Sequence, residues 1–121
     1  MIYEFCAENV TLLEKAMQAG ARRIELCDNL AVGGTTPSYG VTKAAVELAA
    51  NYDSTIMTMI RPRGGDFVYT DLEIDIMLED IRLTAQAGSQ GVVFGVLTAD
   101  KKLDKPNLEK LIAASKGMEI V

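Results

Sequence analysis

The sequence predicts an α/β fold made of parallel βαβ units, about four and a half units of a TIM (β/α)8 barrel. Short apolar runs of strand length alternate with longer helical segments, in the order βαβαβαβαβ. The segments "QAGARRIELC" and "QAGSQGVVFG" share a helix end and a following strand, which is a weak internal repeat. A whole barrel typically needs about 250 residues. The 121 residues therefore predict a single domain, residues 1–121, with about half of the units that a barrel needs.

An open, doubly wound parallel sheet is the second architecture that this order of elements permits. The first predicted strand is not followed by a Gly-x-Gly-x-x-Gly turn. A dinucleotide-binding sheet therefore lacks its best marker, whereas a barrel needs eight units and about four and a half are present.

The first two strands and the helix between them are predicted from short local signals. Ile2–Ala7 forms the first strand, and a helix follows as far as Gly20. Thr11 and Glu14 have the spacing of a capping box, in which each side chain satisfies a free backbone N–H of the other residue. Arg23–Cys27 is the second strand, because apolar and polar residues alternate along it.

The middle of the chain predicts a helix, a strand and a second helix. Val41–Tyr52 is helical, and Thr55–Arg61 is the third strand, which Pro62 and the following glycines end. Thr70 and Glu73 form a second capping box, which opens a long helix that runs to about Ala87.

The last third of the chain predicts one further unit and the start of another. Gly91–Leu97 is apolar almost throughout, as expected for a strand that is covered on both faces. Pro106 suits the first turn of a helix that continues over Asn107–Ser115. Met118–Val121 then begins a fifth strand.

Composition and charge exclude several classes of partner. The formal net charge is −5 and the acidic residues are scattered, which argues against nucleic acid because binding phosphates needs a basic face. The longest apolar runs, Ile56–Ile60 and Val92–Leu97, are too short to span a membrane. The start of the chain lacks the features of a signal peptide, so we expect a cytoplasmic protein. There is no histidine, so neither a Ser-His-Asp triad nor a histidine-rich zinc site can form from this chain alone.

One face of the first two strands is polar and carries both cysteines. Side chains alternate along a strand, so Glu25 shares a face with Cys27 and Arg23, and Cys6 shares one with Glu4. In a barrel this face lines the interior, where charged groups need partners. Glu25 is therefore either part of a structural ion-pair layer or a general acid/base or cation ligand near the carboxyl ends of the strands.

The two cysteines are candidate ligands of a soft metal. A disulfide is disfavoured in an intracellular protein, and Cys6 and Cys27 fall near the carboxyl ends of neighbouring strands. Thiolates, and the thioethers of Met57 and Met59 if they point inward, favour Cu(I) over hard cations. The alternative is ordinary core packing, since both residue types pack well when buried.

Two loops carry the signals of an anion site. Arg61 and Arg63 flank a strand end before two glycines and Asp66, and guanidinium groups bind carboxylates or phosphates with paired donors. The other loop contains Gly33, Gly34 and Thr35, whose backbone N–H groups could bind an anion before the next helix. Alternatively, both are ordinary βα loops that need glycine for their turns.

Four segments, "EFCAEN", "RIELCDNLAVGGTTPSYG", "MIRPRGGDFVY" and "GVVFGVLTADKKLD", together resemble the CutC family of copper homeostasis proteins. The resemblance implies a (β/α)8 barrel, a cytoplasmic location and a link to copper. Cys6 and Cys27 match the cysteines of the family's first two strands. The positions that match polar residues around the barrel mouth are Glu25, Arg61, Arg63 and Asp66.

Family members continue past the fifth strand with a His-containing motif and three further βα units, so residues 1–121 resemble the N-terminal half of a barrel. A half barrel leaves the outer edges of its first and fifth strands unpaired, which favours aggregation or pairing with another chain. We therefore expect either a truncated product of a longer protein or a homo-oligomer.

The leading functional hypothesis is a cytoplasmic copper homeostasis protein that binds Cu(I) through Cys6 and Cys27. The alternative is a TIM-barrel enzyme of unknown reaction that binds a small anionic substrate at the barrel mouth. Its catalytic residues would be Glu25, Arg61 and Asp66, and its substrate-binding residues Arg63, Gly33, Gly34 and Thr35. A third possibility is a fragment that forms oligomers and binds no specific ligand.

Overall fold

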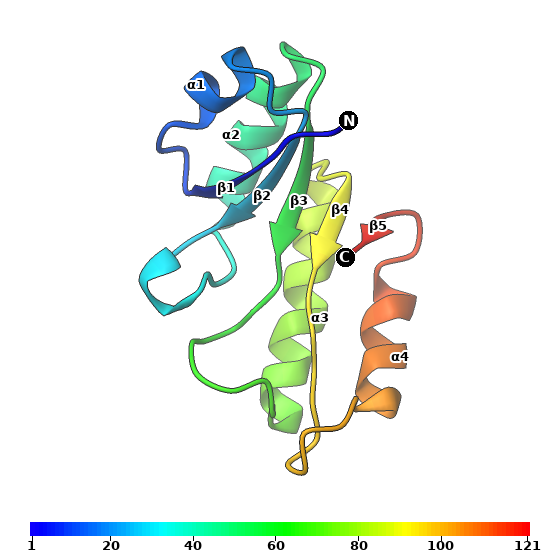
Figure 1. The fold of residues 1–121 in the computed structure, drawn as a ribbon. Helices are drawn as coiled ribbons and strands as arrows, with labels where there is room; N and C mark the ends of the chain where they lie inside the picture. Colours follow the sequence, from blue (N-terminus) through cyan, green and yellow to red (C-terminus); the bar gives the residue numbers. More distant parts are fainter.

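The computed structural model describes residues 1–121 and contains one sheet of five parallel strands (Figure 1). The elements are β1 Glu4–Glu8, α1 Leu13–Gln18, β2 Arg23–Cys27, the short 3-10 helix η1 Leu30–Val32, α2 Tyr39–Ala50, β3 Thr55–Met59, α3 Asp71–Gln86, β4 Gly91–Val93, α4 Lys105–Ala114 and β5 Glu119–Ile120. Each strand pairs with its neighbours in the chain, in the order β1-β2-β3-β4-β5. The predicted parallel α/β fold is therefore confirmed. The order does not reverse, as it would at the switch point of a doubly wound sheet.

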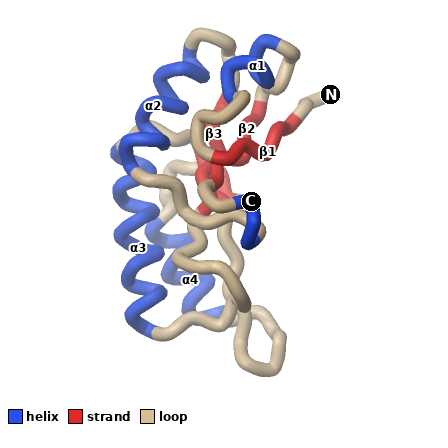
Figure 2. Tube along the Cα trace, turned by 90° about the vertical axis from the view of Figure 1, so that its left-hand side faces the viewer, coloured by secondary structure: helices blue, strands red, loops and turns tan.

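Helices cover one face of the sheet, and the other face carries none. In Figure 2, α2 and α3 run along one side of the strands. The apolar side chains of β1, β2 and β3 on that side are Ala7, Ile24, Leu26 and Ile56, and they pack against α1 and α2. A second core cluster joins Ile60, Val92 and Val96 to α3 and α4. The polar face predicted from the alternation of β1 and β2 is thus the face opposite the helices.

Strand register aligns one residue of every strand across this second face. Cys6 lies opposite Glu25, Glu25 opposite Met57, Met57 opposite Gly91, and Gly91 opposite Glu119. Gly91 has no side chain, and the thioether of Met57 occupies the space above it. Met57 is 1% exposed, because the absence of a side chain at Gly91 leaves room for the large Met57 side chain to be buried there.

The two predicted capping boxes have different outcomes. The box at Thr70 is confirmed, because its hydroxyl accepts from the backbone N–H of Glu73 and the Glu73 carboxylate accepts from the backbone N–H of Thr70. The box at Thr11 is wrong. The connection from β1 to α1 is so short that Asn9 and Leu12 take positive φ, and α1 starts at Leu13 without a side-chain cap.

The fourth strand is shorter than the apolar run predicts. β4 ends at Val93, and the chain leaves the ladder although Val96 remains buried in the second core cluster. The N–H of Leu97 instead donates to the carbonyl of Phe67, in the loop between β3 and α3. The end of the apolar run is therefore a buried loop and not part of the strand. An apolar pattern alone does not distinguish the two. No helix in the structure has the length and apolar character needed to cross a membrane.

The close fit over Gly91 predicts a large effect of adding one methyl group. A Cβ at this position would lie 2.6 Å from the sulfur of Met57 and 2.8 Å from the carbonyl oxygen of Glu119. Gly91→Ala should lower the free energy of unfolding by about 1–3 kcal/mol, the usual range for overpacking. Gly95→Ala is the matched control, because a Cβ there meets nothing within 4 Å. Urea unfolding measures both variants, and equal stability of the two would contradict the packing.

Candidate metal centre

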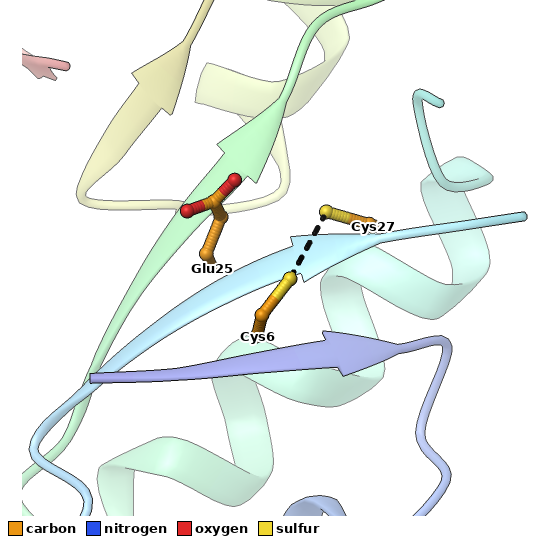
Figure 3. Close-up of side chains that lie close together, drawn as sticks. All are labelled: Cys6, Glu25 and Cys27. Carbon is orange, nitrogen blue, oxygen red and sulfur yellow. Dashed lines mark hydrogen bonds between the residues drawn. The ribbon is translucent and has the colours of Figure 1, made fainter. Parts of the chain in front are cut away.

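Cys6, Glu25 and Cys27 come together on the face of the sheet that carries no helix. One ligand atom from each, the two sulfurs and a carboxylate oxygen, lie within 4.8 Å of one another. The two sulfurs are 4.0 Å apart and point toward each other from β1 and β2, with Glu25 beside them (Figure 3). Both cysteines are free thiols. The structure thus brings together both predicted metal ligands and one predicted catalytic residue.

The separation of the two sulfurs fits a metal with three ligands. Two sulfurs that each lie about 2.3 Å from a metal stand about 4 Å apart when the angle at the metal is about 120°. The Sγ–Sγ distance of 4.0 Å matches this trigonal arrangement without any movement of the strands. A third donor is then needed, and the Glu25 carboxylate is within reach.

The surroundings keep the two thiols protonated in the absence of metal. Burial raises the pKa of the Cys27 thiol to about 12, with smaller contributions from Cys6 and Glu25. Burial also raises the pKa of Cys6, opposed by its hydrogen bond with Cys27 and reinforced by the charges of Glu25 and Glu4. The pKa of Glu25 is raised first by burial and then by Glu4. A cation would lower all three, because it stabilises the deprotonated ligands.

The ion-pair layer predicted on this face forms only in part. Arg23 and Glu4 pair, with 2.5 Å between the guanidinium Nε and the carboxylate. Glu25 has no ion-pair partner, so its carboxylate is free to serve as a ligand. The thioether of Met57 leans over Gly91 of β4, and Met59 lines a separate cavity, so the methionines belong to other parts of the face.

The loop that contains Gly33, Gly34 and Thr35 packs against the buried Cys27. Gly34 has φ +97°, and a Cβ at this position would lie 3.1 Å from the sulfur of Cys27. The backbone N–H groups of this loop, which the sequence predicts to bind an anion, are already bonded within the protein. The N–H groups of Gly33, Gly34 and Thr35 donate to the carbonyls of Leu30, Asn29 and Asp28. The loop therefore closes on itself and packs against the metal-ligand candidate.

Comparison with known proteins shows the family of this chain. The model of the CutC family matches residues 1–121. The chain belongs to the CutC family. A CutC family protein of Streptococcus pyogenes serotype M6 is 54% identical over 121 residues, and one of Enterococcus faecalis is 51% identical over 120. These matches cover 100% and 99% of this chain but 58% and 57% of the relatives.

A solved structure of a CutC protein has the same fold. The crystal structure of the CutC protein from Streptococcus agalactiae, which is named as a copper homeostasis protein, superposes with a TM-score of 0.95 at 48% identity. The match covers 99% of this chain and 57% of that chain. The CutC chain described here thus spans a little over half the length of the relatives that it matches, and its sheet is part of a TIM barrel.

The arginine loop of this CutC chain is held together by its own charges. Arg63 donates to Glu73, to both the side chain and the carbonyl of Asp66, and to the carbonyls of Gly64 and Val68. Asp66 also accepts from the N–H of Val68. Asp66 is not part of the metal-ligand cluster, and neither Arg63 nor Asp66 lines the cavity that contains Arg61.

Arg61 connects the glycine loop to the arginine loop. Arg61 is 7% exposed, and its guanidinium donates to the carbonyls of Val32 and Gly34 on one side and Gly65 on the other. Its backbone N–H donates to the hydroxyl of Thr36. Arg61 therefore has a structural task in addition to the catalytic role predicted for it.

Sequence reasoning missed Phe67 and Tyr69. The guanidinium of Arg61 lies over the Phe67 ring, 5.1 Å from its centroid, and that of Arg63 lies 5.0 Å from the centroid of Tyr69. The alternation of two arginines and two aromatic residues in "RPRGGDFVY" is a signal that could have predicted this stacking.

The difference in exposure and pKa between the thiols predicts ordered alkylation. Cys6 is exposed and Cys27 buried, so iodoacetamide should label Cys6 first. Both pKa values are raised, so the reactive thiolate is scarce at neutral pH, and each rate should rise about tenfold per unit up to about pH 9. Mass spectrometry of the labelled peptides measures both rates. Faster labelling of Cys27, or a rate that levels off below about pH 8, would contradict this electrostatic picture.

Proposed function

We propose that this CutC chain takes part in copper homeostasis by binding one Cu(I) ion between Cys6 and Cys27. The observation that carries the proposal is the pair of free thiols 4.0 Å apart with the Glu25 carboxylate beside them. Thiolates are soft ligands that select Cu(I) over Mg²⁺ or Ca²⁺. The name of the Streptococcus agalactiae relative supports copper as the metal.

The asymmetry of the two cysteines suits a site that receives and releases its ion. Cys27 is fully buried at the end of β2 and is held in place by Gly34, so it provides a fixed ligand. Cys6 is exposed on β1 and can meet an incoming ion first. Exchange between a donor molecule and this site would then begin at Cys6 and end at Cys27.

Proton release accompanies binding in this proposal. The raised pKa values mean that both thiols carry protons before the ion arrives, and Cu(I) replaces them. Affinity should therefore increase with pH over the neutral range. Because two free thiols persist only in a reducing compartment, the proposal also includes a cytoplasmic location.

Substitution of either cysteine tests the copper site. Cys6→Ser or Cys27→Ser should weaken Cu(I) binding by at least about 100-fold, because a soft ligand is replaced by a hard one. Glu25→Gln should weaken it less, by roughly tenfold, if the carboxylate is the third ligand. Competition with a chromogenic Cu(I) chelator, under anaerobic and reducing conditions, measures the affinities.

Asp66→Asn is the control for the copper experiment, since Asp66 is exposed and bonded within the arginine loop. It should bind Cu(I) like the unmodified chain. Undiminished copper binding in both serine variants would refute the site. Tighter binding of Zn²⁺ than of Cu(I) would refute its proposed selectivity.

We also propose that the chain associates with a second copy through its sheet edges. The outer edges of β1 and β5 have no partner strand, and Ile2, Tyr3 and Ile120 expose apolar side chains there. Unpaired edges with apolar side chains favour pairing between chains. Ile120→Lys should shift the population toward monomer in size-exclusion chromatography with light scattering. A chain that is monomeric at about 100 μM before substitution would contradict the proposal.

A further inference from the structure

A cavity separate from the cysteine cluster lies where β3 and β4 end. Its volume is about 250 Å³. The residues that line it are Gly33, Met59, Ile60, Arg61, Phe67, Tyr69, Val93, Phe94 and Gly95. The carboxyl ends of parallel strands are where barrels and other α/β proteins bind their ligands. The cavity therefore occupies the position where a ligand is expected, although it shares no residue with the copper site proposed above.

The Nε atom of Arg61 is a buried hydrogen-bond donor that the protein does not use. The guanidinium has five N–H groups. Its Nη1 and Nη2 atoms donate to carbonyls of the two flanking loops, whereas the Nε atom is buried without a partner. An unpaired buried donor costs about 1–3 kcal/mol, so a ligand that accepts from Nε would recover that cost.

Tyr69 provides a second unused polar group on the wall of the same cavity. Its hydroxyl is buried and has no hydrogen-bond partner. Burial raises the pKa of Tyr69, and the positive charges of Arg61 and Arg63, together with the neighbouring Arg61 side chain, oppose that increase. Two side-chain atoms in the structure are buried without a hydrogen-bond partner, Arg61 Nε and the Tyr69 oxygen, and both residues line this cavity.

The charge at this cavity is positive and unbalanced. The acidic residues that form ion pairs do so with Arg23, Arg63, Arg82 and Lys102, and none pairs with Arg61. The three carbonyls that bind the Arg61 guanidinium are neutral, so they do not cancel its charge. A buried charge without a counterion is costly. A ligand with a negative charge would supply that counterion.

The remaining walls are apolar and define the rest of the ligand. Met59, Phe67, Val93 and Phe94 surround the polar corner, and the face of the Phe67 ring already packs on the guanidinium. Phosphate alone would leave these walls without a partner, and it needs more donors than Arg61 Nε and the Tyr69 hydroxyl supply. A carboxylate joined to a compact apolar group satisfies both parts of the cavity.

We propose that this cavity binds a small organic carboxylate, with Arg61 Nε and the Tyr69 hydroxyl donating to the carboxylate and the apolar group packed against Met59 and Phe94. This proposal keeps the anionic ligand that the sequence predicts, but it assigns different hydrogen-bond donors to that ligand. The N–H groups of the glycine loop and the guanidinium of Arg63 are already bonded within the protein. Two groups that no protein atom satisfies take their place.

Benzoate is a suitable probe, with benzamide as its neutral isostere and inorganic phosphate as an anion without an apolar group. Binding is measured on the full chain by titration calorimetry and by chemical-shift changes of backbone amides. Benzoate should bind, and benzamide and phosphate should bind at least about tenfold more weakly. The amides that shift should be those at the ends of β3 and β4.

Tyr69→Phe is the sharpest variant, because it removes one oxygen that has no partner and leaves the ring in place. It should weaken benzoate binding about tenfold, while the unfolding midpoint stays the same or rises because an unsatisfied buried group is lost. Tyr39→Phe, at an exposed tyrosine outside the cavity, is the matched control and should change neither property. Arg61→Lys should also weaken binding, but it breaks contacts between loops, so unfolding is measured beside it.

Three results would overturn the proposal. The first is no benzoate binding up to about 10 mM, a concentration at which even weak site-specific ligands are detected. The second is unchanged affinity in Tyr69→Phe, and the third is equal affinity for benzoate and benzamide. Loss of copper binding in the cysteine variants leaves this test untouched, because no cysteine lines the cavity.

Discussion

Parallel pairing of consecutive strands is the constraint on which the rest of this structure depends. Each connection between parallel neighbours must cross the sheet, and such crossovers have a fixed right-handed sense. All the helices consequently lie on the same face, where the apolar residues of the strands meet them. The opposite face of the sheet is not covered by these helices, and polar side chains and thiols lie on it. That face holds the two cysteines, Glu25 and the Arg23–Glu4 pair.

The register of the strands then determines which of these side chains can act together. Cys6 lies opposite Glu25, two residues along the ladder from the pair of Glu8 and Cys27. The two sulfurs therefore approach diagonally, close enough to share an ion. A shift of the register by one residue would move every one of these side chains to the opposite face, since side chains alternate along a strand.

Arg61 has the corresponding organising role at the ends of the strands. Its guanidinium ties the loop after β2 to the loop after β3 through three carbonyls. Gly34 is one of the residues it binds, and Gly34 in turn packs against Cys27. The copper site and the carboxylate cavity are thus made of different residues but share this support. A change at Arg61 is expected to reach both, whereas changes at Cys6 or Tyr69 act on one site only.

The sequence by itself determined the order of the elements, the polar face of β1 and β2, and the two cysteines as neighbours on that face. These features follow from local patterns: periodicity, caps such as Thr70–Glu73, and alternation along a strand. Only the tertiary structure decided the donors at the strand ends. Arg63 and the glycine-loop N–H groups are bonded within the protein, while Arg61 Nε and the Tyr69 hydroxyl are not. A sequence shows which groups can donate, but whether a donor is already used depends on contacts between loops that lie far apart in the chain.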